Sequence, residues 1–113
     1  MNIQIFGSKK SSDSRKAERW FKERRIRFQY IDLAEKGLSK GELRSVAQAV
    51  GGIEALVDEK AKDAYAVSLV QHTPAAMRED VLLENQQVLR APIVRNGRQA
   101  TVGYAPEIWK EWN

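Results

Sequence analysis

A serine-rich loop near the N-terminus carries the residues best placed for chemistry. Gly7 to Ser14 reads G-S-K-K-S-S-D-S and leads directly into a predicted helix. Backbone N–H groups at a helix N-terminus bind phosphate and similar anions. Self-capping by Ser12 or Asp13 would satisfy the same N–H groups, and the Asp13 charge opposes an anion, so self-capping is the favoured interpretation. The candidate anion ligands of the loop are Lys9, Lys10, Ser11, Ser12, Ser14 and Arg15.

The residue types that the chain lacks exclude much other site chemistry. With no cysteine there is no thiolate nucleophile, no disulfide, no cysteine-ligated zinc and no iron–sulfur cluster of the usual kind. The single histidine, His72, cannot form a multi-histidine metal site, and the acidic residues do not cluster. A nucleophilic serine needs a general base, and His72 lies in a different segment from the loop. We therefore expect no metal, no cofactor and no serine catalysis.

Positive charge is concentrated in one stretch of the chain. Residues 9–27 carry nine Lys or Arg against three acids, a net +6, so the rest of the chain is −2 in a total of +4. Such a helix can attract an acidic partner, a phosphate-bearing ligand or nucleic acid. Only one predicted helix carries the stretch and no arginine-rich arm extends it, so direct nucleic-acid binding is not expected. An acidic partner remains open.

Length and composition predict one domain that spans residues 1–113. The chain is 42% hydrophobic and 30% charged, which is the balance of a compact globular protein. The N-terminus has no signal-peptide pattern, and no segment approaches the apolar length of a membrane span. We expect a cytoplasmic protein that does not bind membranes.

Hydrophobic periodicity predicts a β-α-β unit around the loop. Residues 2–6 alternate as a strand, and a helix begins near 12–14 and ends near 25. Residues 27–31 alternate again and form a second strand, parallel to the first. The loop thus lies between the first strand and the first helix.

The remaining elements complete a mixed sheet. Ser39 to Glu42 has a capping-box pattern that starts a helix over 40–50, which Gly51-Gly52 ends. Residues 58–67 are weakly helical, and Thr73-Pro74 begins another helix that extends through Leu82 towards Leu89. Residues 91–95 and 98–102 form a hairpin about an Asn96-Gly97 turn, with Pro92 as the first residue of its strand, and a last helix covers 106–112. The order predicts an α/β fold: a mixed four-stranded sheet with flanking helices and a helical insertion.

Four segments together resemble a known family. They are S-R-K-A-x-x-W-F from Ser14, L-V-D-E-K from Leu56 after Gly51-Gly52, L-R-A-P-I-V from Leu89, and V-G-Y-x-P-E from Val102. In combination the sequence resembles the arsenate reductase and Spx family of thioredoxin-like, glutaredoxin-like proteins over nearly the whole chain. The resemblance implies a thioredoxin-like fold.

The resemblance also shows what this chain has lost. Members of the family carry a catalytic or redox-sensing cysteine in the loop before the first helix, and the matching positions here are Ser11 and Ser14. Of the arginines that clamp the oxyanion in the arsenate reductases, one matches Ala91, with Arg90 one residue earlier, one matches Lys60, and one falls near Gly103. Lys60 keeps a charge but not the bidentate fork of arginine. The resemblance therefore implies a redox-inactive member with vestigial positions Ser11 and Ser14.

Two functions follow from these expectations. The leading one is a non-catalytic binding or regulatory domain that uses loop 7–14, Pro92 and the basic helix. The alternative is a glutaredoxin-linked arsenate reductase whose site is degenerate or engineered to be cysteine-free; weak binding of an oxyanion or glutathione would then involve the loop together with Lys60, Arg90 and Pro92.

A protein interface is also implied by the resemblance. Spx binds the C-terminal domain of the RNA polymerase α subunit, and the residues with the corresponding spacing here are Gly52 and Lys60. Gly52 has a structural explanation as well, because glycine after a helix supplies the left-handed cap. Another protein partner is therefore favoured over the polymerase domain.

Overall fold

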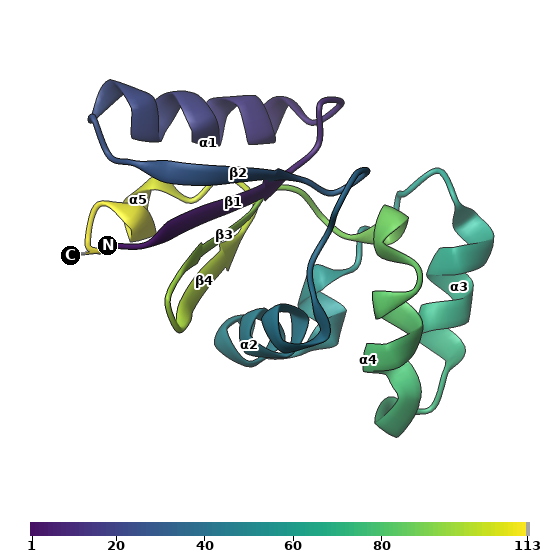
Figure 1. The fold of residues 1–113 in the computed structure, drawn as a ribbon. Coiled ribbons are helices and arrows are strands. Elements are labelled where there is room, and N and C mark those ends of the chain that lie inside the picture. The colour runs from purple at the N-terminus through teal and green to yellow at the C-terminus, as the bar shows by residue number, and fades with distance from the viewer. Residues whose placement is uncertain (113) are drawn as a thin grey trace.

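A four-stranded mixed sheet organises the molecule (Figure 1). The structure is a computed structural model that describes residues 1–112. The strands β1 (Ile3–Gly7), β2 (Phe28–Asp32), β3 (Ile93–Asn96) and β4 (Gln99–Val102) lie in the order β2-β1-β3-β4. β1 pairs with β2 in parallel, and the other two pairings are antiparallel. The expected α/β fold with a mixed four-stranded sheet is confirmed.

Each face of the sheet is covered by helices. On one face, α1 (Ser12–Glu23) and α5 (Pro106–Trp109) pack on Ile3, Ile5 and Val94. On the other, α2 (Lys40–Val50) and the helices after it pack on side chains that include Phe6 and Ile93. The two faces follow from the alternation of β1, because successive side chains of a strand point to opposite sides. Figure 1 shows α1 and α2 on opposite sides of the sheet.

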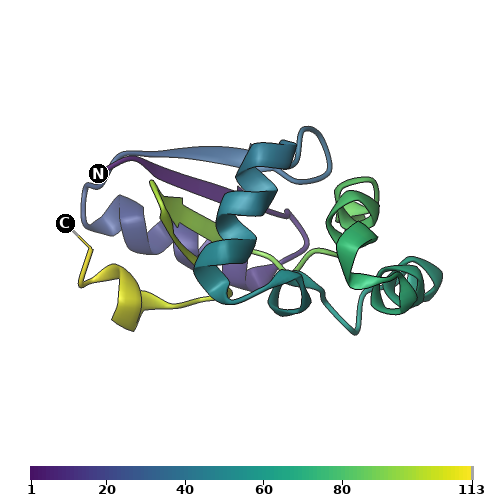
Figure 2. The same ribbon diagram turned by 90° about the horizontal axis from the view of Figure 1, so that it is seen from below.

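The helical insertion extends beyond one end of the sheet (Figure 2). It consists of α3 (Ala64–His72) and α4 (Ala75–Leu83), with the short 3-10 helices η1 (Ile53–Leu56) before them and η2 (Gln86–Val88) after them. The predicted helix over 58–67 was misplaced. α3 begins six residues later, because Asp63 caps it by accepting a hydrogen bond from the Ala66 N–H at 3.0 Å. α4 ends at Leu83 instead of continuing towards Leu89, which pairs with Val57 in an isolated bridge.

Several predicted boundaries are wrong by one to three residues. β1 and β2 each begin and end one residue later than expected, and α5 ends at Trp109 instead of Trp112. In the hairpin Asn96 pairs with Gln99, so the turn residues are Gly97 and Arg98. Gly97 has φ +62°, which suits glycine at the first turn position. β3 begins after Pro92, which has no N–H to give to a ladder.

None of the helices within residues 1–112 is long and apolar enough to cross a membrane.

Candidate functional site

Ser11 is the N-cap of α1. It has extended backbone angles, φ −93° and ψ 118°, and its Oγ accepts a hydrogen bond from the Ser14 N–H at 3.0 Å. The prediction that Ser12 or Asp13 caps the helix is therefore wrong. Both residues lie inside the first turn of the helix. The Ser14 N–H is bonded by the side chain of the residue before that turn, Ser11, which has extended backbone angles.

The buried side chain of Ser14 bonds to the backbone of the loop. The residue is fully buried, and its Oγ accepts a hydrogen bond from the Ser8 N–H at 3.1 Å. The hydroxyl also lies near the Tyr30 phenol on β2, where it opposes the rise in the pKa of that phenol. The two serines that match the family's cysteines are thus both engaged as hydrogen-bonding groups of the fold.

A hydrogen bond joins the loop to the segment before β3. The Ser11 Oγ donates to the Ala91 carbonyl at 3.3 Å, and the Ala91–Pro92 peptide bond is cis. Pro92 is buried, and its carbonyl accepts from the Gly103 N–H at 2.8 Å. The structure therefore brings together the start of α1, the Pro92 segment and the residue after β4.

The predicted basic ligands are only partly brought together. Arg15 turns back over the loop, and its guanidinium donates to the Lys9 carbonyl at 2.8 Å. Lys9, Lys10 and Ser12 are exposed at the loop. Arg90 is held against η1: its N–H donates to the Leu56 carbonyl at 2.7 Å, and its guanidinium lies 3.4 Å from the Ala55 carbonyl.

The two interface candidates, Lys60 and Gly52, are held by local backbone contacts. Lys60 is exposed in a turn where its N–H donates to Asp58 Oδ1 at 3.0 Å, and no hydrogen bond or ion pair within residues 1–112 connects its ammonium to the loop. Gly52 has φ +137° and donates its N–H to the Ala47 carbonyl at 2.8 Å. This backbone conformation by itself requires glycine.

Sequence reasoning missed the contact between Gly7 and Tyr30. A Cβ placed on Gly7 would lie 2.5 Å from the Tyr30 Oη, so the phenol packs directly on the Gly7 backbone where β1 passes into the loop. Burial raises the pKa of the Tyr30 hydroxyl, and the nearby Glu18 and Asp32 carboxylates raise it further. The only sequence signal was a glycine at a strand end followed by an alternating strand.

The site offers hydrogen-bond donors and cations, and no reactive group. The first-turn amides of Ser12 and Asp13 have no carbonyl partner within the helix, and Lys9, Lys10 and Arg15 add positive charge around them. Within residues 1–112 no three His, Asp or Glu side chains come together as a metal site. With Ser11 in place of a thiol, this arrangement can hold an anion but cannot form a disulfide or a thiol adduct.

A comparison with models of known protein families covers nearly all of these elements. A model described as the ArsC family matches residues 6–112. The chain belongs to the ArsC family. It is a member without cysteine. No curated protein gives a significant match to its sequence.

Solved structures share the fold of this chain. An arsenate reductase from Vibrio cholerae has a TM-score of 0.82 and 24% identity over 98% of this chain and 97% of that one. An ArsC family related protein from Bacteroides fragilis has a TM-score of 0.83 and 19% identity, with the same coverage of both chains. At these identities the likeness is one of fold, and the ArsC fold of the chain is thereby confirmed.

Proposed function

We propose that this ArsC-family chain is redox-inactive and acts in the cytoplasm as a non-catalytic binding or regulatory domain, with loop 7–14 and the adjoining Pro92 segment as its ligand site. The observation that carries the proposal is the Ser11 hydroxyl, which caps α1 and bonds to the Ala91 carbonyl. This bond keeps the loop geometry of the fold while no sulfur is present for chemistry. Binding is the property that survives such a replacement.

The class of ligand follows from the donors at the loop. The free amides of the first turn and the positive end of the helix dipole favour a small oxyanion such as phosphate or arsenate, or the carboxylates of glutathione. Asp13 opposes this, but its carboxylate lies 4.0 Å from Lys16 Nζ, which offsets part of its charge. The expected binding is weak and depends on salt.

The test replaces one amide donor without disturbing the helix. Ser12→Pro removes the N–H of the first helical residue, a position that proline tolerates well, and Ser11 before it already has the extended backbone that proline requires. We expect the apparent affinity for inorganic phosphate to fall about tenfold, because a hydrogen bond to a charged group is lost. Affinity is measured as the stabilisation against urea at increasing phosphate, with chloride at matched ionic strength as the reference.

Lys40→Pro is the matched control. It places proline at the first residue of α2, where Ser39 likewise caps the helix from an extended conformation. This variant is expected to keep the phosphate effect of the wild type. Equal loss in both variants, or no phosphate effect in the wild type beyond that of chloride, would refute the loop as the anion site.

One observation supports the alternative function, a degenerate or engineered site of an arsenate reductase. That observation is the position of the Ser11 hydroxyl. An atom there receives the Ser14 N–H and faces the positive end of α1, which are the features that lower a thiol pKa. Ser11→Cys is therefore expected to titrate below the usual thiol pKa of about 8.5. The measurement is the pH dependence of alkylation by iodoacetamide.

The control for this variant is Ala49→Cys. Ala49 is exposed in the last turn of α2, at the negative end of a helix, so its thiol should show no lowering of the pKa. If Ser11→Cys titrates like Ala49→Cys, the geometry for sulfur chemistry has been lost and the alternative falls. A lowered pKa alone is not expected to bring arsenate reduction, because Ala91 stands where the family has an arginine before the proline.

Binding of an RNA polymerase α C-terminal domain stays a prediction of the family resemblance. The backbone of Gly52 already accounts for its glycine, so a substitution there would report on folding. Only Lys60, which is exposed, offers a residue whose replacement would report on that contact.

A further inference from the structure

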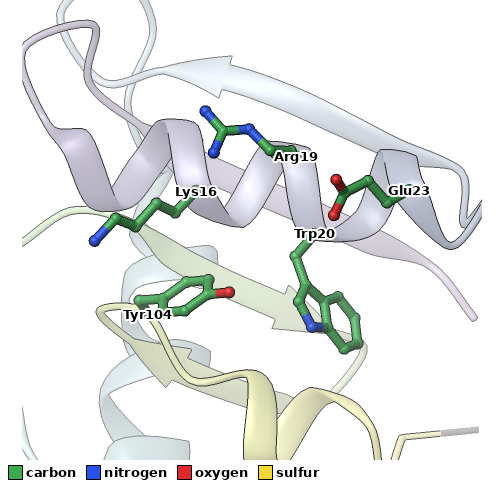
Figure 3. A pocket seen from close by; sticks show the side chains of 5 residues that line it. All are labelled: Lys16, Arg19, Trp20, Glu23 and Tyr104. Atoms are coloured by element: carbon green, nitrogen blue, oxygen red, sulfur yellow. The ribbon is translucent and has the colours of Figure 1, made fainter.

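An open cleft of about 390 Å³ lies along the side of α1. Figure 3 shows the five side chains that line it, four from α1 and one from the segment after β4: Lys16, Arg19, Trp20, Glu23 and Tyr104. The α1 residues and Tyr104, which are 81 or more positions apart in the sequence, thus form one surface. None of these five belongs to the proposed anion site.

The cationic side of the cleft is largely unneutralised. Lys16 and Arg19 are both exposed, and Lys16 forms an ion pair with Asp13 at 4.0 Å. Within the part of the chain that the structure describes, the Arg19 guanidinium makes no side-chain hydrogen bond or ion pair. The stretch 9–27 that contains α1 has a net charge of +6. This surface is complementary to a ligand with negative charge.

The other side of the cleft is aromatic. The Tyr104 side chain is 41% exposed, although its ring packs edge-on against the buried Trp109 with centroids 5.5 Å apart. Trp20 forms the floor and is itself fixed by the Arg24 guanidinium, 4.0 Å above its ring. A rigid, half-exposed tyrosine beside arginine and tryptophan is the composition that concentrates binding energy at protein interfaces.

We propose that this cleft docks an acidic peptide segment of a partner protein, with an apolar or aromatic side chain of the segment against Tyr104 and its carboxylates on Lys16 and Arg19. α1 has 12 residues and is about 18 Å long, so an extended segment of about six residues spans it. Glu23 in the cleft and the acids Asp13 and Glu18 on the same helix interrupt the positive charge. A continuous phosphate backbone would meet repulsion there, whereas a peptide can place its acids selectively.

The test uses fluorescence anisotropy of a fluorescein-labelled peptide of about six residues, with one central Phe among Asp and Glu. The full-length chain is titrated against it, and against a variant peptide with Ser in place of Phe and an oligonucleotide of equal charge. We expect saturable binding of the Phe peptide that weakens with salt, and weaker binding of both comparison probes.

Variants of the cleft locate the binding. Arg19→Glu is expected to weaken the Phe peptide about fivefold, since it replaces an attractive exposed pair by a repulsive one. Tyr104→Ser is expected to weaken it about tenfold and to abolish the preference for Phe over Ser. Arg98→Glu makes the same charge change at the exposed hairpin turn. Measured at an ionic strength that screens the change in net charge, it should leave the affinity within twofold.

Three results would each overturn the proposal: no saturable binding of the acidic peptide, equal weakening by Arg98→Glu and Arg19→Glu, or tighter binding of the oligonucleotide. The thermal unfolding midpoint of each variant verifies that the fold is intact. If a cleft variant unfolds, Lys16→Glu is measured in its place, because the Lys16 side chain lines the same cleft and is exposed. Phosphate binding at the loop is measured separately, so its failure would not be mistaken for failure at the cleft.

Discussion

Replacement of Trp109 by alanine is expected to lower the free energy of unfolding by about 3–5 kcal/mol. Trp109 is only 2% exposed, and its ring lies within 5.4 Å of the Trp20 ring and 5.1 Å of the Phe21 ring, centroid to centroid. The substitution leaves a large cavity between α5 and α1 and removes the aromatic contacts that hold both helices on the sheet. Urea denaturation of the variant and the wild type measures the loss.

Two further variants separate packing from hydrogen bonding at Trp109. Its indole N–H donates to the Thr101 Oγ1 at 2.7 Å inside the core, so Thr101→Val leaves a buried donor unpaired at a cost of about 1–3 kcal/mol. Ile108→Ala, on the exposed side of the same helix, should change stability by about 0.5 kcal/mol or less. A loss below about 1 kcal/mol for Trp109→Ala would mean that α5 is not anchored as the structure shows.

Gly7→Ala is expected to destabilise the protein by about 1–3 kcal/mol. The added Cβ would lie 2.5 Å from Tyr30 Oη and 2.8 Å from Tyr30 Cζ, which forces the ring or the strand to move. Because the Tyr30 ring packs on Gly7, where β1 passes into the loop, movement of the strand also disturbs the start of the loop. The same urea experiment measures the effect.

A double-mutant cycle tests the cause of the Gly7 effect. Gly7→Ala in a Tyr30→Ala background should cost much less than in the wild type, because the group that it meets is gone. Gly41→Ala is the control: nothing lies within 4 Å of a Cβ there, and alanine favours the helix by up to about 1 kcal/mol. Additive effects of Gly7→Ala and Tyr30→Ala would show that the close approach is not what requires glycine.

The order of elements could be predicted from the sequence because each follows from local patterns. The alternation in β1 and β2, the capping box at Ser39 and the hairpin signal at Asn96-Gly97 all depend on neighbouring residues. Their errors are also local. The hairpin turn slipped by one residue because pairing of Asn96 with Gln99 decides its register.

The candidate site could be predicted less well because tertiary contacts decide it. Ser11, Ser12 and Asp13 are equally good caps by residue type, and the contact of Ser11 with the Ala91 carbonyl, 80 positions away, is not visible in the sequence. The basic stretch on α1 was evident, but its apolar neighbour Tyr104 follows 85 residues after Arg19 and meets it only through the packing of α5. Local pattern therefore predicted the charges and not the surface that they form.

The central claim, that loop 7–14 binds an anion without redox chemistry, is tested most directly by an NMR amide titration of ¹⁵N-labelled wild-type protein with inorganic phosphate. Arsenate and glutathione follow as further ligands at matched ionic strength. We predict saturable shifts at the amides of Ser12 and Asp13 and their neighbours in the loop, with none at Gly52 or Lys60. The account would be contradicted if the chemical shifts of the loop amides stayed unchanged up to the highest concentrations of phosphate, arsenate and glutathione, each at matched ionic strength.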